Sequence, residues 1–130
     1  MNLEHVALQV PEPVAMADWY VRHLGCSVAR STGEPSFIRF LKDGAGSSMV
    51  ELYRNPRAPV PDYRSMDVML VHLAFLSDNP AADRERLIGA GASIAEDLTT
   101  TPAGDEVLIL RDPWGIALQL IKRADPMVNK

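Results

Sequence analysis

The sequence predicts an α+β protein in which two βαβββ modules follow one another along the chain. Three observations support this fold class: short segments with strand-like alternation, two helical segments with clear stop signals, and a repeat that relates the two halves. The 130 residues, 47% of them hydrophobic, suit a single domain over residues 1–130. Within it we place module 1 at residues 1–55, a linker at 56–67, module 2 at 68–123 and a C-terminal tail at 124–130.

Module 1 opens with a strand, LEHVALQV, whose alternate residues form two faces. Leu8 and Val10 belong to the more apolar face, so His5 points to the other one. A helix is expected in VAMADWYVRHL, where apolar residues recur at helical spacing until Gly25 ends it. Three strands follow, in CSVAR, SFIRFL and SSMVELY, separated by turn-forming residues.

Module 2 repeats this order after a linker that is rich in proline and charge. Its first strand is predicted in VMLVHLAFL, with His72 in the middle. Asn79 and Pro80 form a typical helix start, and the helix ends in the glycine-containing stretch 89–91. Three more strands are expected in SIAED, EVLILR and IALQLIKR, the last two joined by the turn DPWG.

The two halves align with nearly constant spacing. LEHVALQV aligns with LVHLAFLS, LGCSVA with AGASIA, and MVELYR with ALQLIK, at offsets of 67, 66 and 68 residues. Helix stops and strands could match by chance, but the aligned halves also share polar residues inside apolar strands: His5 matches His72, and Glu51 matches Gln119. Their apolar neighbours point to the opposite sheet face, so all four polar side chains lie on the second face of their strands.

Five motifs in this order resemble the vicinal oxygen chelate superfamily, which comprises glyoxalase I, bleomycin resistance proteins and extradiol dioxygenases. They are LEHVALQV, DWYVRHLG, MVELYR, HLAFLSDNPAADRERLIGAGAS and LRDPWGIALQLIKR, which together span nearly the whole chain. The resemblance implies that the sheets curl into an open half-barrel cavity, with the first and fourth strands of each module side by side. It thus implies that His5 lies next to Glu51 and His72 next to Gln119. A homodimer with two sites is expected, with module pairing either swapped or unswapped.

The resemblance also implies a divalent metal ion held by His5, Glu51, His72 and Gln119, with zinc, nickel, manganese, cobalt and iron(II) as candidates. Two histidines and a carboxylate form the three-ligand face of open transition-metal sites. The fourth position in similar enzymes most often carries a glutamate that also serves as a base. Gln119 cannot accept a proton there, although its carbonyl oxygen can bind a metal. Glu51 is therefore the predicted catalytic base.

We accordingly expect a lyase or isomerase that stabilises an enolate of a small molecule with adjacent oxygens. One alternative is a metal-free protein of the bleomycin-resistance type that sequesters a small molecule. Another is an extradiol-type dioxygenase, with His5, His72 and Glu51 as the iron ligands. Arg39, on a predicted strand, could reach the cavity but is more often solvated in such a position, and it is left out of the predicted site.

Composition narrows the other classes of function. The net charge of −4 and the pI near 5.3 argue against a nucleic-acid partner. Cys26 is the single cysteine, which excludes an internal disulfide and suits a reducing compartment. The start MNLEHVALQV has no basic region typical of a signal peptide, and no apolar stretch reaches the roughly 20 residues that span a bilayer. We therefore expect a cytoplasmic protein without a membrane partner.

Overall fold

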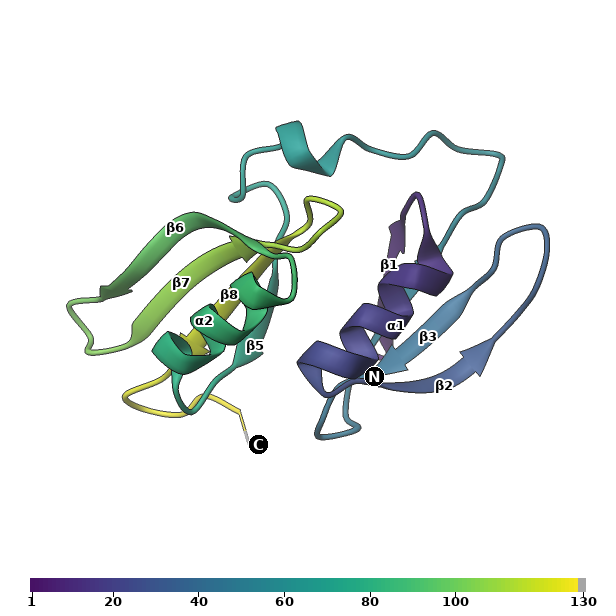
Figure 1. Cartoon of the computed structure of the whole chain (residues 1–130). Helices are drawn as coiled ribbons and strands as arrows, with labels where there is room; N and C mark the ends of the chain where they lie inside the picture. Colours follow the sequence, from purple (N-terminus) through teal and green to yellow (C-terminus); the bar gives the residue numbers. More distant parts are fainter. Residues whose placement is uncertain (129–130) are drawn as a thin grey trace. The chain divides into compact units, whose positions relative to one another are not determined.

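The computed structural model describes residues 1–128, which form two compact units, residues 1–61 and residues 62–128 (Figure 1). Each unit is one βαβββ module, as predicted. The elements of the first are β1 (His5–Gln9), α1 (Pro13–Leu24), β2 (Ser27–Ser31), β3 (Arg39–Lys42) and β4 (Met49–Tyr53). Those of the second are a 3-10 turn (Tyr63–Ser65), β5 (Leu73–Leu76), α2 (Pro80–Gly89), β6 (Ser93–Thr100), β7 (Glu106–Arg111) and β8 (Ala117–Lys122). That residues 1–130 act as one domain stays a prediction.

The two sheets have the same topology, with strand orders β1-β4-β3-β2 and β5-β8-β7-β6. In each sheet the first and fourth strands of the module are parallel neighbours, as the family resemblance implied, and the other pairs are antiparallel. Both sheets are open at their edges and neither closes into a barrel. The sequence prediction of an α+β fold with tandem βαβββ modules is therefore confirmed.

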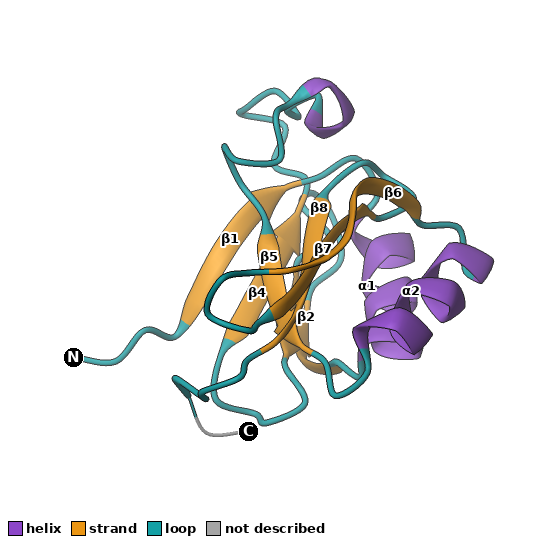
Figure 2. Ribbon diagram, turned by 90° about the vertical axis from the view of Figure 1, so that its left-hand side faces the viewer, coloured by secondary structure: helices purple, strands orange, loops and turns teal. Residues whose placement is uncertain are grey.

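One face of each sheet is covered by the helix of its own module (Figures 1 and 2). The first core contains Tyr20 from α1, which is fully buried, together with Leu41 and Leu52 from the sheet. The second contains Leu87 from α2 with the leucines of β7 and β8, namely Leu108, Leu110, Leu118 and Leu120. These buried rows leave the opposite face of each sheet for the polar residues that alternate with them.

The structural repeat extends to the irregularities of the backbone. Gly25 and Gly91, which the sequence aligns, both follow a helix with a positive φ angle (70° and 105°), a conformation that glycine adopts without steric cost. Both sheets also contain a β-bulge on the strand after the helix, between Val28 and Arg30 in β2 and between Ile94 and Glu96 in β6. In each case the bulge changes which side chains point to the face that the helix leaves uncovered.

The ends of the linker are each held by one polar side chain. In the first unit the buried Gln9 amide donates to the carbonyls of Asn55 and Ala58 (2.6 and 2.7 Å) and accepts from the Asn55 N–H (2.8 Å). In the second unit the Arg111 guanidinium donates to the carbonyls of Tyr63, Met66 and Gly115 at 2.6 to 3.0 Å. The start of the linker is thus fixed to β1, and its end to the β7–β8 hairpin.

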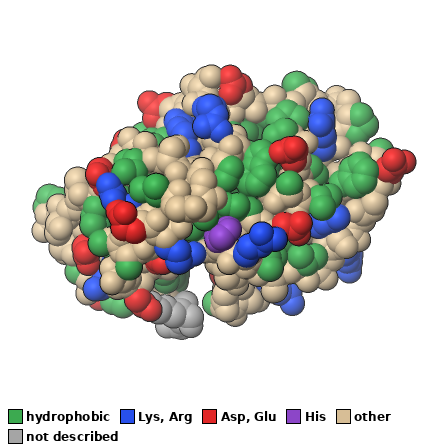
Figure 3. Space-filling view, in the orientation of Figure 1, with side chains coloured by type: hydrophobic (Ala, Val, Ile, Leu, Met, Phe, Trp, Pro, Cys, Tyr) green, Lys and Arg blue, Asp and Glu red, His purple; other side chains and the backbone are tan. Residues whose placement is uncertain are grey.

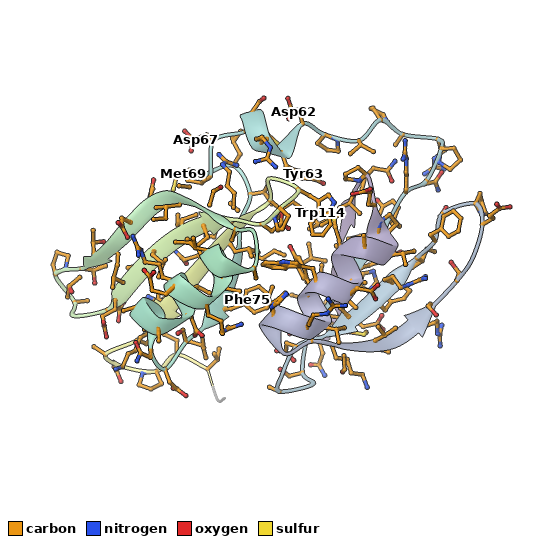
Figure 4. The ribbon with its side chains drawn as sticks, viewed as in Figure 1. Asp62, Tyr63, Asp67, Met69, Phe75 and Trp114 are labelled. Carbon is orange, nitrogen blue, oxygen red and sulfur yellow. The ribbon has the colours of Figure 1, made fainter. Side chains whose placement is uncertain are left out.

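The strand predicted at residues 68–76 begins later, at Leu73. Asp67 starts a turn instead: its carboxylate accepts from the Met69 N–H (2.8 Å) and its carbonyl accepts from the Leu70 N–H (3.0 Å), a capping arrangement typical of aspartate. Figure 4 shows Asp67 and Met69 on this turn ahead of β5. His72 consequently lies just before the strand and not within it.

The strand predicted at residues 36–41 also begins later, at Arg39. Phe37 has a positive φ of 49° and its N–H donates to the Gly33 carbonyl (2.9 Å), so this residue closes a turn and cannot extend the strand. No helix among residues 1–128 has the length and apolar character required to cross a bilayer.

The start of α2 provides a stability prediction. The Asn79 side chain accepts a hydrogen bond from the Ala82 N–H (3.1 Å) and caps the helix ahead of Pro80. Replacing Asn79 with alanine should lower the free energy of unfolding by about 1 kcal/mol, measured by urea denaturation. The matched variant Asn79→Asp keeps the acceptor and should unfold like the original chain. Equal losses in both variants would show that the cap contributes nothing.

Candidate functional site

His5 and Glu51 lie together on the uncovered face of the first sheet. In the parallel pair of β1 and β4, Ala7 is opposite Glu51 and His5 is opposite Met49, so alternation points His5 and Glu51 to the same side. Their side chains approach to 3.3 Å between Nε2 and Oε2. Glu51 is the more enclosed, with 15% of its side chain exposed against 33% for His5. The adjacency implied by the resemblance is therefore present, while the role of both residues as ligands stays a prediction.

Glu4 sets the orientation of the His5 ring. Its Oε1 lies 3.0 Å from His5 Nδ1, so Nδ1 is the natural position for the ring proton of a neutral imidazole. Nε2 then directs its lone pair at the Glu51 carboxylate. Two electron-rich atoms 3.3 Å apart repel each other unless a proton or a cation lies between them. Phe40 supports the ring from the side, with its centroid 5.3 Å away and its plane nearly perpendicular.

His72 and Gln119 occupy the matching positions of the second sheet. Ala74 is opposite Gln119 in the parallel pair of β5 and β8, and His72 lies two residues before Ala74, immediately ahead of β5. His72 Nδ1 lies 3.0 Å from the Val68 carbonyl oxygen. When this carbonyl accepts the Nδ1 proton, Nε2 is left with a free lone pair, as in histidines that bind metals.

Gln119 is half-buried between two buried leucines of β8. Its amide forms no hydrogen bond with any group in the described part of the chain, residues 1–128. Most buried side-chain polar atoms have a hydrogen-bond partner, either a protein group or an ordered water. Because this one has none there, its carbonyl oxygen is available to a ligand or an ion.

Each unit contributes two of the four predicted metal ligands. Within residues 1–128, no three His, Cys, Asp or Glu side chains gather in an arrangement that could hold a metal ion. The first pair nevertheless fits one. Two donors bound about 2.1 Å from one ion are separated by roughly 3.0 to 3.4 Å, depending on the coordination angle, and His5 Nε2 and Glu51 Oε2 are 3.3 Å apart.

Two pockets open on the uncovered faces. A pocket of about 250 Å³ in the first unit is lined by Glu4, Ala29, Arg30, Phe40, Lys42 and Met49, of which Glu4 and Phe40 contact His5. A pocket of about 460 Å³ in the second unit begins at Ala74, the neighbour of Gln119, and reaches Met127 and Val128 in the C-terminal tail. Sequence reasoning identified neither wall.

Arg39 and Cys26 take no part in either pocket. Arg39 pairs with Leu52 and so belongs to the helix-covered side, where its guanidinium donates to the carbonyls of Thr32 and Ile38 (2.8 and 2.9 Å). Burial, together with the nearby Asp43 carboxylate, raises the pKa of the Cys26 thiol to about 11. Cys26 is therefore protonated at neutral pH and is not a nucleophile.

The fold agrees with the comparisons with known proteins. The sequence profile of the Glyoxalase/Bleomycin resistance protein/Dioxygenase superfamily matches residues 2–120, and the chain belongs to this superfamily. No curated protein matches the chain.

Among solved structures, a glyoxalase family protein from Enterococcus faecalis is 27% identical with a TM-score of 0.71, over 93% of this chain and 97% of that one. TnmS3, an antibiotic binding protein from Streptomyces sp. CB03234, is 18% identical with a TM-score of 0.71, over 95% and 97%. A glyoxalase I mutant from Zea mays is 23% identical with a TM-score of 0.75, over 95% of this chain and 46% of that one. The last two likenesses establish the fold alone.

Proposed function

We propose that this chain is a metal-dependent lyase or isomerase of the glyoxalase type, acting on a small molecule with adjacent oxygens. The observation that supports it best is the approach of His5 Nε2 to Glu51 Oε2, 3.3 Å apart and both directed to the uncovered face. His72, with Nδ1 engaged by Val68, and Gln119, with an unengaged amide, would complete the ligand set. Each module contributes two of the four ligands, and we propose a homodimer with two sites. We also propose that the protein is cytoplasmic and has no nucleic-acid partner.

The four side chains have different proposed roles in binding the ion and moving a proton. A divalent ion held by His5, Glu51, His72 and Gln119 would supply Lewis acidity toward two adjacent substrate oxygens. Glu4 holds the Nδ1 side of His5 and keeps Nε2 directed inward. Glu51 is the only carboxylate among the four, so it is the group that can take a proton from the substrate, while Gln119 can only bind or orient. This assignment favours a reaction that needs one base.

Metal content tests the proposal. The chain should bind about one equivalent of zinc, nickel, manganese, cobalt or iron(II), measured by elemental analysis after anaerobic loading and desalting. His5→Ala and His72→Ala should each lose the ion. His23→Ala is the matched control, since His23 lies on α1 beside Trp19, and should retain it. If no ion is retained by the original chain, the enzyme assignment is wrong as stated.

A metal-free binding protein is the second candidate. Similarity to an antibiotic binding protein and the neutral Gln119 in place of a carboxylate favour it. Under this assignment His5 and Glu51, 3.3 Å apart, form a polar pair beside a ligand pocket, and added metal ions change neither stability nor ligand affinity. An extradiol dioxygenase would instead consume oxygen with catechols when loaded with iron(II) or manganese.

A further inference from the structure

A β-bulge places Arg30 on the same side of the first sheet as Glu51. Val28 pairs with Leu41 on the helix-covered side, and regular alternation would set Ala29 opposite Phe40 and return Arg30 to the covered side. The bulge instead pairs Arg30 with Phe40, which is itself opposite Glu51. Arg30, Phe40 and Glu51 therefore form one row across β2, β3 and β4.

Lys42 belongs to the neighbouring row on the same side. It is opposite Met49 in β4, and Met49 is opposite His5 in β1. Arg30 thus lies on the edge strand β2 and Lys42 on the neighbouring strand β3. Phe40 and Met49 form an apolar floor between these cations and the His5–Glu51 pair. Both cations and both apolar residues line the pocket of about 250 Å³.

Neither cation has a counter-charge in the described residues. Within residues 1–128, no acidic side chain lies within ion-pair distance of Arg30 or Lys42, although other basic side chains of the chain are paired, such as Arg84 with Asp97 and Arg123 with Asp105. Diagonal neighbours on adjacent strands are about 7 to 8 Å apart at their backbones, so the two charges repel. Among residues 1–128, Glu4 is the one carboxylate that lines the pocket, and it contacts His5.

The second module lacks this feature, which shows that the fold does not require it. Its bulge pairs Glu96, an acid, with Ile109, which is opposite Gln119. The position that matches Lys42 is Arg111, opposite Ala117, and its guanidinium is engaged by three backbone carbonyls. An unpaired cation pair beside the proposed ligands is thus specific to the first module.

We propose that Arg30 and Lys42 form an anion subsite that holds a carboxylate or phosphate group of the substrate. Neighbouring strands are about 4.8 Å apart, so the backbones of Arg30 on β2 and Glu51 on β4 are separated by roughly 10 Å. The long arginine side chain can bring its guanidinium closer to Glu51 than this. The substrate is then a small organic anion with a short apolar stretch between its acidic group and its adjacent oxygens. This inference rests on the proposed function, since it concerns the substrate of the same site.

Anion titrations test the subsite. Benzoate, phenyl phosphate, inorganic phosphate and the neutral benzyl alcohol are added to the chain, with the Met49 methyl and Arg30 Nε–H signals followed by NMR. Benzoate or phenyl phosphate should shift both signals in a saturable manner. The compound that binds with the higher affinity shows whether the subsite prefers a carboxylate or a phosphate. In the double variant Arg30→Gln/Lys42→Gln the affinity should fall at least about tenfold, since two charge-assisted contacts are lost.

The double variant Arg22→Gln/Arg57→Gln is the matched control, because it removes the same charge from exposed positions of the same unit. It should bind the anions like the original chain. The subsite is contradicted if both double variants lose equal affinity, if neither loses any, or if benzyl alcohol binds as tightly as benzoate.

Titrations with and without metal separate this inference from the proposed function. If the original chain retains no metal but Arg30→Gln/Lys42→Gln still loses anion binding, the subsite stands and the enzyme assignment fails. If metal binds through His5 and His72 but anion affinity is the same in all variants, the enzyme assignment stands and the subsite is wrong.

Discussion

Replacing Glu51 with glutamine is expected to weaken metal binding at least about 100-fold. Loss of a group that only orients a ligand typically costs 10- to 100-fold, and Glu51 is itself one of the four predicted ligands. It is also the only charged one, so the variant leaves four neutral donors around a divalent ion. In the original chain Glu51 Oε2 lies 3.3 Å from His5 Nε2, where its negative charge would balance that of an ion bound to both atoms. The neutral glutamine cannot supply this charge. Isothermal titration against a competing chelator measures the affinity.

Two further variants allow the loss of metal affinity in Glu51→Gln to be compared with smaller expected changes. Glu4→Gln keeps all four ligands but removes the carboxylate next to His5 Nδ1, so about a 10- to 100-fold loss is expected. Glu34→Gln removes an exposed carboxylate from a turn of the same unit and should change nothing. In Glu51→Gln the catalytic rate should fall further than the fraction of protein that still holds the ion, because the substitution also removes the base. Equal affinity in Glu51→Gln and Glu34→Gln would exclude Glu51 as a ligand.

Much of the arrangement around Glu51 could be predicted from the sequence, because it depends on a simple alternation. A strand with one buried face must point every second residue to the other face, so His5 and Glu51 were expected on the uncovered side of β1 and β4. The repeat related His72 and Gln119 to His5 and Glu51 at nearly the same spacing. The family resemblance then implied that the first and fourth strands of each module are neighbours. The sheet registers that bring Ala7 opposite Glu51 and Ala74 opposite Gln119 agree with that prediction.

Features that break the alternation could not be predicted. A bulge depends on hydrogen bonds to the partner strand, and CSVAR contains no residue that indicates a bulge. The sequence therefore drew attention to Arg39, which the structure places on the covered side, and missed Arg30, which it places beside Phe40. The turn at Asp67 was missed because Val68, Met69 and Leu70 extend an apolar run, although Met69 is 69% exposed.

The charge patterns of the two uncovered faces also differ more than the repeat suggested. The first carries Glu51 with an unpaired Arg30, whereas the second carries Gln119 with Glu96. Over the face of the molecule drawn in Figure 3, acidic and basic side chains are interspersed without a large region of one sign. The sign of the charge at the bulge, cationic at Arg30 and acidic at Glu96, therefore distinguishes the uncovered faces of the two sheets.

Replacing Gln119 with glutamate is expected to tighten metal binding by about 10- to 100-fold. The four predicted donors carry one negative charge, which leaves a divalent ion with a net charge of +1, and a second carboxylate would neutralise it. Part of the Coulomb gain is offset by the cost of desolvating the new charge, so roughly 1.4 to 2.8 kcal/mol should remain. Gln119 has no hydrogen bond within residues 1–128 that this substitution would break.

The matched variant Gln119→Met separates coordination by this side chain from a general effect of charge. Methionine has a similar length but lacks the hard carbonyl oxygen that a divalent ion prefers. If Gln119 coordinates the ion, affinity should rise in Gln119→Glu and fall in Gln119→Met. If the amide only lines the pocket near the ion, glutamate should still tighten binding while methionine leaves it unchanged. If the cavity is a metal-free ligand pocket, neither variant should alter metal affinity, because there is no ion for position 119 to contact.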